Sequence, residues 1–318
     1  MPTKGKKFLF LLLFITVFWA GFFISQNTSF ITRGGSDCDN NFPLLNQAVV
    51  CDFSEEKNLE AVQSLEIKTN DLISSLKKEG KISRVSVFFR DLSSKKWFGI
   101  SQNEKYAPAS LLKLPMIMAY YKLSEIDPDL FSKKYIFKKI DPLFSQDIEP
   151  KVRLEEGKEY TIEEILQQMI VFSDNSAMDF LMDMLDQNFM EREYYNLGII
   201  FNGGQEDYLS PIIYSNILRM LYNSSYLTRN SSEKILGLLS ETDFNNGLVS
   251  GVPAGITVAH KFGERDIDAA TKEFHDCGII YPPGHPYILC VMTTGDNYSN
   301  LEKFISDVSR LAYEEIKN

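Results

Sequence analysis

The chain has 318 residues and a mass of 36.4 kDa, with 44% hydrophobic and 24% charged residues. This composition is typical of a folded globular protein and excludes collagen-like, low-complexity and largely disordered chains. The 33 basic and 43 acidic residues give a net charge of -10, so we expect no nucleic-acid partner. A chain of this length can bury a core without disulfide bonds.

The first 26 residues are predicted to be a membrane or export signal. Three lysines precede an unbroken apolar run from Phe8 to Ser25, which is 18 residues long. As a helix this run would measure about 27 Å, close to the roughly 30 Å hydrocarbon core of a bilayer. No small-x-small cleavage site follows Phe23, which favours an uncleaved signal-anchor over a signal peptide. We therefore expect a single-pass protein of the cell membrane with its domain outside the cytoplasm, or a secreted protein if the segment is cleaved.

Residues 27–53 are predicted to be a stalk and residues 54–318 a folded domain. The spacing of apolar residues predicts a long amphipathic helix from Ser54 to Lys78, ended by Gly80. Two strand-like segments follow over Arg84–Arg90 and Trp97–Ser101, joined by a polar turn.

The middle of the chain, about 111–248, is predicted to be mostly helical. Its clearest helix follows Thr161, whose side chain can cap the first turn while Glu164 completes a capping box. Apolar residues at helical spacing continue beyond this cap, so a buried helix is expected there.

The last part of the chain contains three strand-like runs and a helix. The runs cover Ile256–Phe262, Lys272–Tyr281 and Tyr287–Thr294, and an amphipathic helix follows over Leu301–Ile316. Strands at both ends of the domain with helices between them predict a mixed α/β (α+β) fold. Its antiparallel sheet is built from both termini and flanked by helices, with an inserted all-helical subdomain. The functional site is expected between sheet and subdomain.

The four cysteines fall into two equally spaced pairs, Cys38 with Cys51 and Cys277 with Cys290. A hairpin turn over 282–285 would place Cys277 opposite Cys290, where either a disulfide or two half-buried thiols is possible; the thiols are favoured. The three histidines are scattered and no Cys-x-x-Cys occurs, so we expect no metal site and no cofactor.

The first motif with chemical meaning is Ser110-Leu-Leu-Lys113. Six Ser-x-x-Lys matches occur in the chain, so the pattern alone carries little information. Ser110 differs because an apolar segment follows it, which predicts a buried helix. A buried Lys113 amine is costly to keep charged, so its pKa should fall toward the value that the base of a serine nucleophile needs.

Two further motifs follow along the chain. Ser173-Asp-Asn175 comes where the capped helix ends, and alone it is typical of a helix-capping turn. The stretch His260-Lys-Phe-Gly-Glu264 ends a predicted strand, where an isolated Lys261 is commonly a residue that protects a sheet edge.

Together, in this order and 63 and then 88 residues apart, the three motifs resemble those of the penicillin-recognising serine enzymes, most closely the class A β-lactamase-like family. The resemblance extends to Tyr160-Thr-Ile-Glu-Glu, to Leu209-Ser-Pro, and to the stretch from His275 to Gly295. It covers roughly Lys81–Ile316 and implies a β-lactamase/transpeptidase-like fold.

The resemblance also implies roles for individual residues. Ser110 would be the acylated nucleophile and Lys113 its base, and Ser173 would pass a proton to the leaving nitrogen. Asn175 would bind the amide side chain of the substrate, and Lys261 would add positive charge. The backbone N–H groups of Ser110 and of Glu264, which follows Gly263, would form an oxyanion hole. The implied substrates are β-lactams and the D-Ala-D-Ala end of cell-wall peptides.

The sequence departs from the family at two places. Phe262 replaces the hydroxyl residue that helps to hold the substrate carboxylate, and Arg265 is a weak substitute because an exposed turn arginine is the more common interpretation. Between Asn175 and Pro211 there is no Glu-x-x-x-Asn to activate a deacylating water. Glu206 and Asp207 lie in this connection, where solvated side chains are the expected interpretation.

We therefore expect a serine hydrolase that forms an acyl-enzyme and releases it slowly. The alternative is a catalytically silent envelope scaffold that keeps the fold and binds a peptide or protein. Phe262 and the missing glutamate favour the scaffold, whereas the intact Ser110, Lys113 and Ser173 favour the enzyme.

Overall fold

The fold is known from a computed structural model that describes residues 44–45, 59–140, 146–201 and 206–316. All of these residues belong to one compact unit, Asn41–Asn318. The predicted membrane segment lies outside the described residues, so the division into anchor, stalk and domain stays a prediction. No helix in the described ranges is long and apolar enough to cross a membrane.

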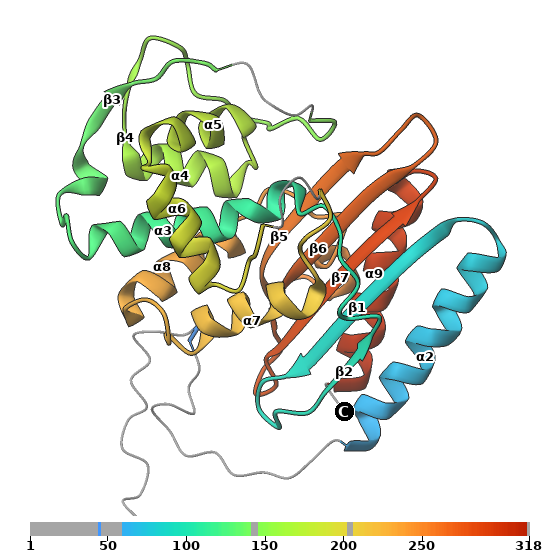
Figure 1. Cartoon of the computed structure of the whole chain (residues 1–318). Coiled ribbons are helices and arrows are strands. Elements are labelled where there is room, and N and C mark those ends of the chain that lie inside the picture. Colours follow the sequence, from blue (N-terminus) through green and yellow to red (C-terminus); the bar gives the residue numbers. More distant parts are fainter. Residues whose placement is uncertain (1–43, 46–58, 141–145, 202–205, 317–318) are drawn as a thin grey trace, which may run out of the picture. The chain divides into compact units, whose positions relative to one another are not determined.

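The centre of the unit is a five-stranded sheet with the strand order β2-β1-β7-β6-β5 (Figure 1). It contains β1 (Ile82–Asp91), β2 (Trp97–Ile100), β5 (Thr257–Asp266), β6 (Lys272–Tyr281) and β7 (Tyr287–Gly295). All neighbouring strands are antiparallel. The predicted antiparallel sheet from both ends of the domain is therefore confirmed, and β5 lies at one edge.

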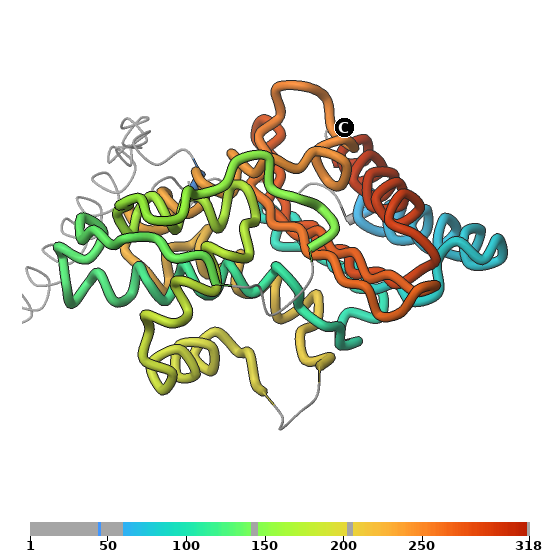
Figure 2. The backbone as a smooth tube through the Cα atoms, turned by 90° about the horizontal axis from the view of Figure 1, so that it is seen from above, coloured from blue at the N-terminus to red at the C-terminus, as the bar shows by residue number. Residues whose placement is uncertain are grey.

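Helices cover both faces of this sheet. On one face α2 (Leu59–Lys78) and α9 (Tyr298–Ile316) pack side by side, as Figure 2 shows. On the other face α7 (Pro211–Tyr222) packs on β7, β6 and β1. The side chains of β7 alternate between the two cores, because Leu289 and Val291 join α2 and α9 whereas Ile288 and Met292 join the helical part.

Helices dominate the segment between β2 and β5, as predicted. They are α3 (Lys113–Ser124), α4 (Ile162–Val171), α5 (Asn175–Met184), α6 (Gln187–Asn196), α7 and α8 (Arg229–Ser240). Thr161 and Glu164 form the predicted capping box at the start of α4. The segment also contains a small antiparallel pair, β3 (Lys134–Ile136) with β4 (Glu159–Thr161). This pair was not predicted, because strands of only three residues, none of them buried, have no readable alternation.

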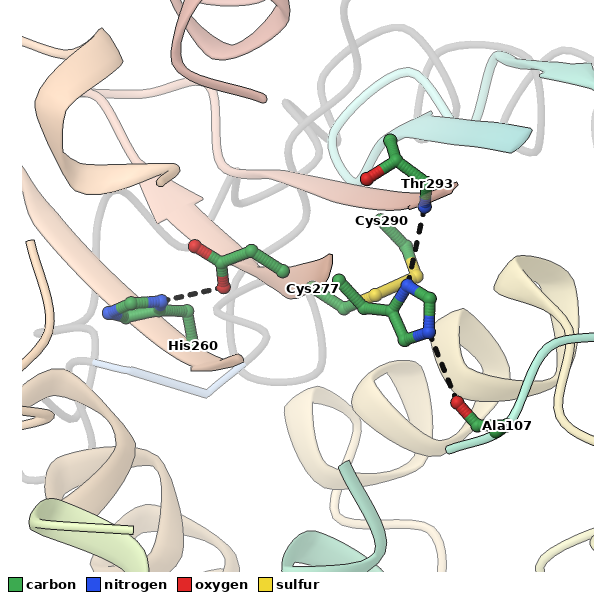
Figure 3. Close-up of a disulfide and its surroundings, with 7 residues drawn as sticks. Ala107, His260, Cys277, Cys290 and Thr293 are labelled. Carbon is green, nitrogen blue, oxygen red and sulfur yellow. Dashed lines mark hydrogen bonds and ion pairs between the residues drawn. A yellow bond between two sulfur atoms is a disulfide. The ribbon is translucent and has the colours of Figure 1, made fainter. Parts of the chain in front are cut away.

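A disulfide joins Cys277 of β6 to Cys290 of β7 (Figure 3). The two residues are direct register partners with a Cα–Cα distance of 3.9 Å, and both are completely buried. The favoured interpretation of two half-buried thiols was therefore wrong, because the hairpin brings the two side chains to the same face at bonding distance. Cys38 and Cys51 lie outside the described residues.

Of the predicted stalk, the structure describes only Leu44 and Leu45, and both are bound to the domain. The Leu44 N–H donates to the Glu233 carboxylate at 3.2 Å, and the Tyr281 hydroxyl donates to the Leu44 carbonyl at 2.9 Å. Leu45 is buried in the helical core. At this point the chain is therefore attached to the surface formed by α8 and β6.

Candidate active site

Ser110 lies in a 3₁₀ turn, Ala109–Leu112, that runs directly into α3. Ala109 has a φ of +46°, a left-handed conformation that an alanine adopts only when its surroundings impose it. Such strain is concentrated at functional sites in folded proteins. The backbone before Ser110 is therefore held in place by tertiary contacts.

One of these contacts is made by His275 of β6, which forms hydrogen bonds with Ala107 and Thr293 (Figure 3). The Thr293 N–H donates to Nδ1 of His275 at 3.3 Å, so Nε2 carries the proton and donates to the Ala107 carbonyl at 3.1 Å. Burial lowers the pKa of His275 to about 4, which keeps the ring neutral. This ring fixes the segment that leads to Ser110, a role that the sequence analysis did not find.

Lys113 lies one helical turn beyond Ser110 and is completely buried. Its Nζ is 3.0 Å from Ser110 Oγ, 2.5 Å from the Ser173 carbonyl oxygen and 2.6 Å from Asn175 Oδ1. Burial lowers the pKa of Lys113 to about 7, although the carboxylate of Asp174 opposes this shift. The predicted burial and reduced basicity of the amine are both present.

The Ser173-Asp-Asn175 turn joins α4 to α5. Asp174 accepts a hydrogen bond from the Ser176 N–H at 2.9 Å, so the capping interpretation is correct for this residue. Ser173 has a φ of +55° and is completely buried. Its hydroxyl accepts hydrogen bonds from Lys113 at 3.2 Å and from Lys261 at 2.9 Å.

Lys261 projects from β5 into this cluster and is not an exposed residue of the sheet edge. It is completely buried, and its Nζ also donates to the Phe262 carbonyl at 2.9 Å. Burial and the nearby Lys113 amine lower the pKa of Lys261 well below its usual value. The structure thus joins two lysines through one serine hydroxyl.

A second buried pair lies behind Lys261. His260 Nδ1 is 2.7 Å from Asp276 Oδ1, a contact drawn in Figure 3, and the Leu248 N–H donates to Asp276 Oδ2 at 2.8 Å. The exposed fraction is 1% for His260 and 0% for Asp276. This pair ties β5 to β6 next to the lysine.

Gly263 is the point where β5 passes the nucleophile. A Cβ atom on this residue would lie 3.3 Å from the Ser110 nitrogen and 3.1 Å from the Pro108 carbonyl oxygen, which is tighter than side chains normally pack. Glycine therefore allows the strand to approach the Ser110 amide closely. Glu264, the other sequence-predicted binding residue, follows immediately.

The side chain of Glu264 makes a contact that the sequence did not reveal. Its Oε1 accepts a hydrogen bond from the Ile148 N–H at 2.6 Å. Two residues earlier, Gln146 Nε2 donates to the Ser173 carbonyl at 2.9 Å. Residues 146–148, which we call the strap, therefore connect the Ser173 turn to β5.

Phe262 is buried and offers no hydroxyl to the site. Its ring stacks on Phe244 with a centroid distance of 4.3 Å, and Lys261 Nζ lies 4.1 Å from the Phe262 ring centroid. The ring thus presents its aromatic face to the Lys261 amine and no hydrogen-bond donor to the site. The structure therefore also lacks the hydroxyl group that the family motif has at this position.

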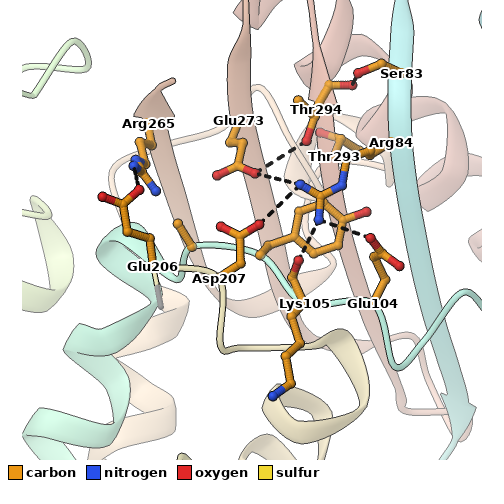
Figure 4. A network of polar contacts seen from close by, with 12 residues as sticks. Ser83, Arg84, Glu104, Lys105, Glu206, Asp207, Arg265, Glu273, Thr293 and Thr294 are labelled. Atoms are coloured by element: carbon orange, nitrogen blue, oxygen red, sulfur yellow. Dashed lines mark hydrogen bonds and ion pairs between the residues drawn. The ribbon is translucent and has the colours of Figure 1, made fainter. Parts of the chain in front are cut away.

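The acidic residues of the connection before α7 are engaged elsewhere (Figure 4). Glu206 is exposed and pairs with Arg265, and Asp207 lies 3.3 Å from Arg84. Arg84 also approaches Glu273, whose pKa burial raises to about 7.

Glu193 of α6 is turned into the protein, where it contacts the Tyr226 hydroxyl and Arg192. The Glu193 carboxylate is therefore engaged within the protein. It does not replace the water-activating glutamate of the missing Glu-x-x-x-Asn motif.

Known proteins resemble this chain in fold and in sequence. A mutant of PBP-A, solved as an acyl-enzyme complex with penicillin G, superposes with a TM-score of 0.67 at 20% identity, covering 83% of this chain and 99% of that one. The TLA-3 extended-spectrum β-lactamase superposes with a TM-score of 0.69 at 22% identity, covering 80% and 98%. Among sequences, β-lactamase VEB-1 of Pseudomonas aeruginosa is 25% identical over 271 residues, covering 76% of this chain and 88% of its own length.

The fold is thus that of the penicillin-recognising serine enzymes. The sequence model of the beta-lactamase enzyme family matches residues 65–316, and the chain belongs to this family. The fold and the family expected from the sequence are both confirmed.

Proposed function

We propose that the protein is a serine acyl-transfer hydrolase in which Ser110 forms an acyl-enzyme with β-lactams or with D-Ala-D-Ala-type wall peptides. One observation carries the proposal: the buried Lys113 amine lies 3.0 Å from Ser110 Oγ and has a pKa of about 7. A base of this pKa is partly neutral at physiological pH and can accept the serine proton. Membership of the beta-lactamase family supports the same reaction class.

The reaction follows from the positions of the side chains. Lys113 removes the hydroxyl proton as Ser110 Oγ bonds to the substrate carbonyl carbon, and the negative charge on the carbonyl oxygen is stabilised by the N–H groups of Ser110 and Glu264. The C–N bond then breaks. The leaving nitrogen takes a proton from the Ser173 hydroxyl, which Lys113 and Lys261 contact at 3.2 Å and 2.9 Å and can reprotonate.

We infer slow deacylation from the acidic side chains around the site. Glu193 is held by Tyr226, Glu206 by Arg265 and Asp207 by Arg84, so none of them is placed to activate a water at Ser110. The adduct of Ser110 should therefore persist for minutes to hours.

The proposal is tested by intact-mass spectrometry of the purified full chain incubated with penicillin G. We expect an adduct with the mass of the whole penicillin in the wild type and none in Ser110→Ala. Ser231→Ala, which removes the serine of another Ser-x-x-Lys match at the start of α8, is the matched control and should acylate normally. A folded wild type without adduct or turnover would overturn acyl transfer and favour the binding scaffold.

We further propose that the domain is held outside the cytoplasm by a single membrane pass over Phe8–Ser25, as the apolar run and its preceding lysines predict. Fractionation of cells that express the chain tests this. We expect the protein to remain with the membranes after a high-salt wash and to be digested by protease added outside. Recovery in the cytoplasmic fraction would contradict the proposal.

A further inference from the structure

Glu264 is the first side chain of β5 beyond the nucleophile. The strand touches the Ser110 turn at Gly263, whose Cβ position lies 3.3 Å from the Ser110 nitrogen. The strap runs from the Ser173 carbonyl to the Glu264 carboxylate through Gln146 and Ile148. In the proposed reaction Ser173 protonates the leaving nitrogen, and the strap joins the Ser173 turn to Glu264, so Glu264 lies on the side of the site where groups attached to that nitrogen would be held.

The charge at this end of the strap is negative. Two neighbouring cations are engaged with other carboxylates, because Arg265 pairs with Glu206 and Lys272 with Asp266 at 2.5 Å. The buried amines of Lys113 and Lys261 interact with the Glu264 charge at longer range, but burial lowers the pKa of both amines. Within the described ranges, no lysine or arginine forms an ion pair with Glu264. A ligand therefore meets a carboxylate that has no direct ion-pair partner in the described part of the chain.

One oxygen of this carboxylate lacks a well-placed hydrogen-bond donor. Oε1 binds the Ile148 N–H, whereas Oε2 is enclosed and makes no hydrogen bond of good geometry within the described part of the chain, although the Asp147 N–H also faces the carboxylate. Because Oε2 is enclosed, a ligand is affected by the charge of the carboxylate and not by a direct hydrogen bond to this oxygen, and a second anion placed nearby is repelled. Phe262 offers no hydroxyl that could offset this effect for an anion.

We propose that Glu264 is a specificity-determining residue: it disfavours acyl donors with a carboxylate beside the leaving nitrogen and favours donors that are uncharged or cationic there. This inference rests on the proposed acyl transfer at Ser110. It differs from that proposal because it concerns which acyl donor reacts fastest, and it would place free penicillins and D-Ala-D-Ala peptides, which both carry this carboxylate, among the poorer substrates.

A series of three compounds tests the inference: penicillin G, its methyl ester and its 2-diethylaminoethyl ester. The carboxylate beside the ring nitrogen is free in the first compound, blocked and uncharged in the second, and replaced by a cation in the third. Second-order acylation rates of the full chain are measured by intact mass and divided by the hydroxide-catalysed rate of each compound. We expect the cationic ester to react about tenfold faster than the free acid, the effect of one partly screened charge pair.

Glu264→Gln keeps the size of the side chain and an acceptor oxygen but removes the charge, and it should reduce this ratio to about one. Glu163→Gln makes the same charge change on exposed α4, where the carboxylate lies 3.9 Å from Lys234, and should leave the ratio unchanged. Equal rates for the three compounds, or fastest reaction of the free acid, would overturn the inference while leaving Ser110 acylation intact. If none of the compounds gives an adduct that Ser110→Ala abolishes, the proposed function fails and the inference fails with it.

Discussion

The environment of Lys113 acts on the charge of its amine in two opposite directions. Complete burial disfavours the ammonium form, whereas three oxygen acceptors within 3.0 Å and the nearby Asp174 stabilise it. Burial wins, and the pKa falls from 10.5 to about 7. The amine can therefore exchange a proton with Ser110 at neutral pH.

This balance predicts the pH dependence of acylation. Only the neutral amine accepts the Ser110 proton, and it becomes the major form above the pKa of about 7, so the acylation rate should rise with pH from 6 to 8 and then level off. Stopped-flow acylation by penicillin G across this range is the measurement. Lys113→Arg stays charged, so its rate should not rise with pH and should be about 10²–10³ below the wild-type rate above pH 7. A wild-type rate that is flat or falls with pH would exclude Lys113 as the base.

Residue types and spacing predicted the members of this cluster but not all of their contacts. The burial of Lys113 followed from the apolar segment after Ser110, and the structure shows it. The hydrogen bond from Ile148 to Glu264 joins residues 116 positions apart in loop and strand, and no periodicity marks such a pair. The role of His275 was likewise not predictable, because a single histidine in a strand does not indicate which backbone segment lies opposite its ring.

At the scale of elements, β5 positions the site, because one face of the strand supplies Lys261 while its edge passes the Ser110 amide at Gly263. The buried His260–Asp276 pair fixes the strand to β6 behind these residues. The strand register was predictable because apolar runs and the Pro-Pro-Gly-His turn set the hairpin between β6 and β7. The disulfide across that hairpin depended on side-chain direction and oxidation, which the spacing left open.

The close approach at Gly263 gives a prediction about this strand. Gly263→Ala places a Cβ 3.1–3.3 Å from backbone atoms of the nucleophile turn, so β5 must move by a few tenths of an ångström and the oxyanion hole widens. We expect the acylation rate to fall about tenfold while the thermal midpoint changes little. Gly237→Ala in α8, where no atom lies within 4 Å of the new Cβ, is the control and should be fully active and slightly more stable. Normal acylation by Gly263→Ala would show that the approach is not needed for catalysis.

For the whole molecule, the site exists only when three distant segments of the domain meet. The Ser110 turn follows the first hairpin, the Ser173 turn lies among the helices, and β5 belongs to the last third of the chain. Buried hydrogen bonds from Lys113 and Lys261 span 60 and 88 residues to reach Ser173. The fold thus brings a hydroxyl and two amines together out of water, where the reduced basicity of the amines makes proton transfer at neutral pH feasible.

The most direct test of Ser110 as the nucleophile and Lys113 as its base is to find which residue carries the acyl group. The full chain is treated with penicillin G, quenched in acid, digested and mapped by tandem mass spectrometry. We expect a penicilloyl group on Ser110 alone, in the peptide that contains Lys113, and its absence from Lys113→Met. A penicilloyl group on another residue, or labelling of Ser110 that persists at the wild-type rate in Lys113→Met, would contradict the assignment of Ser110 and Lys113 as nucleophile and base.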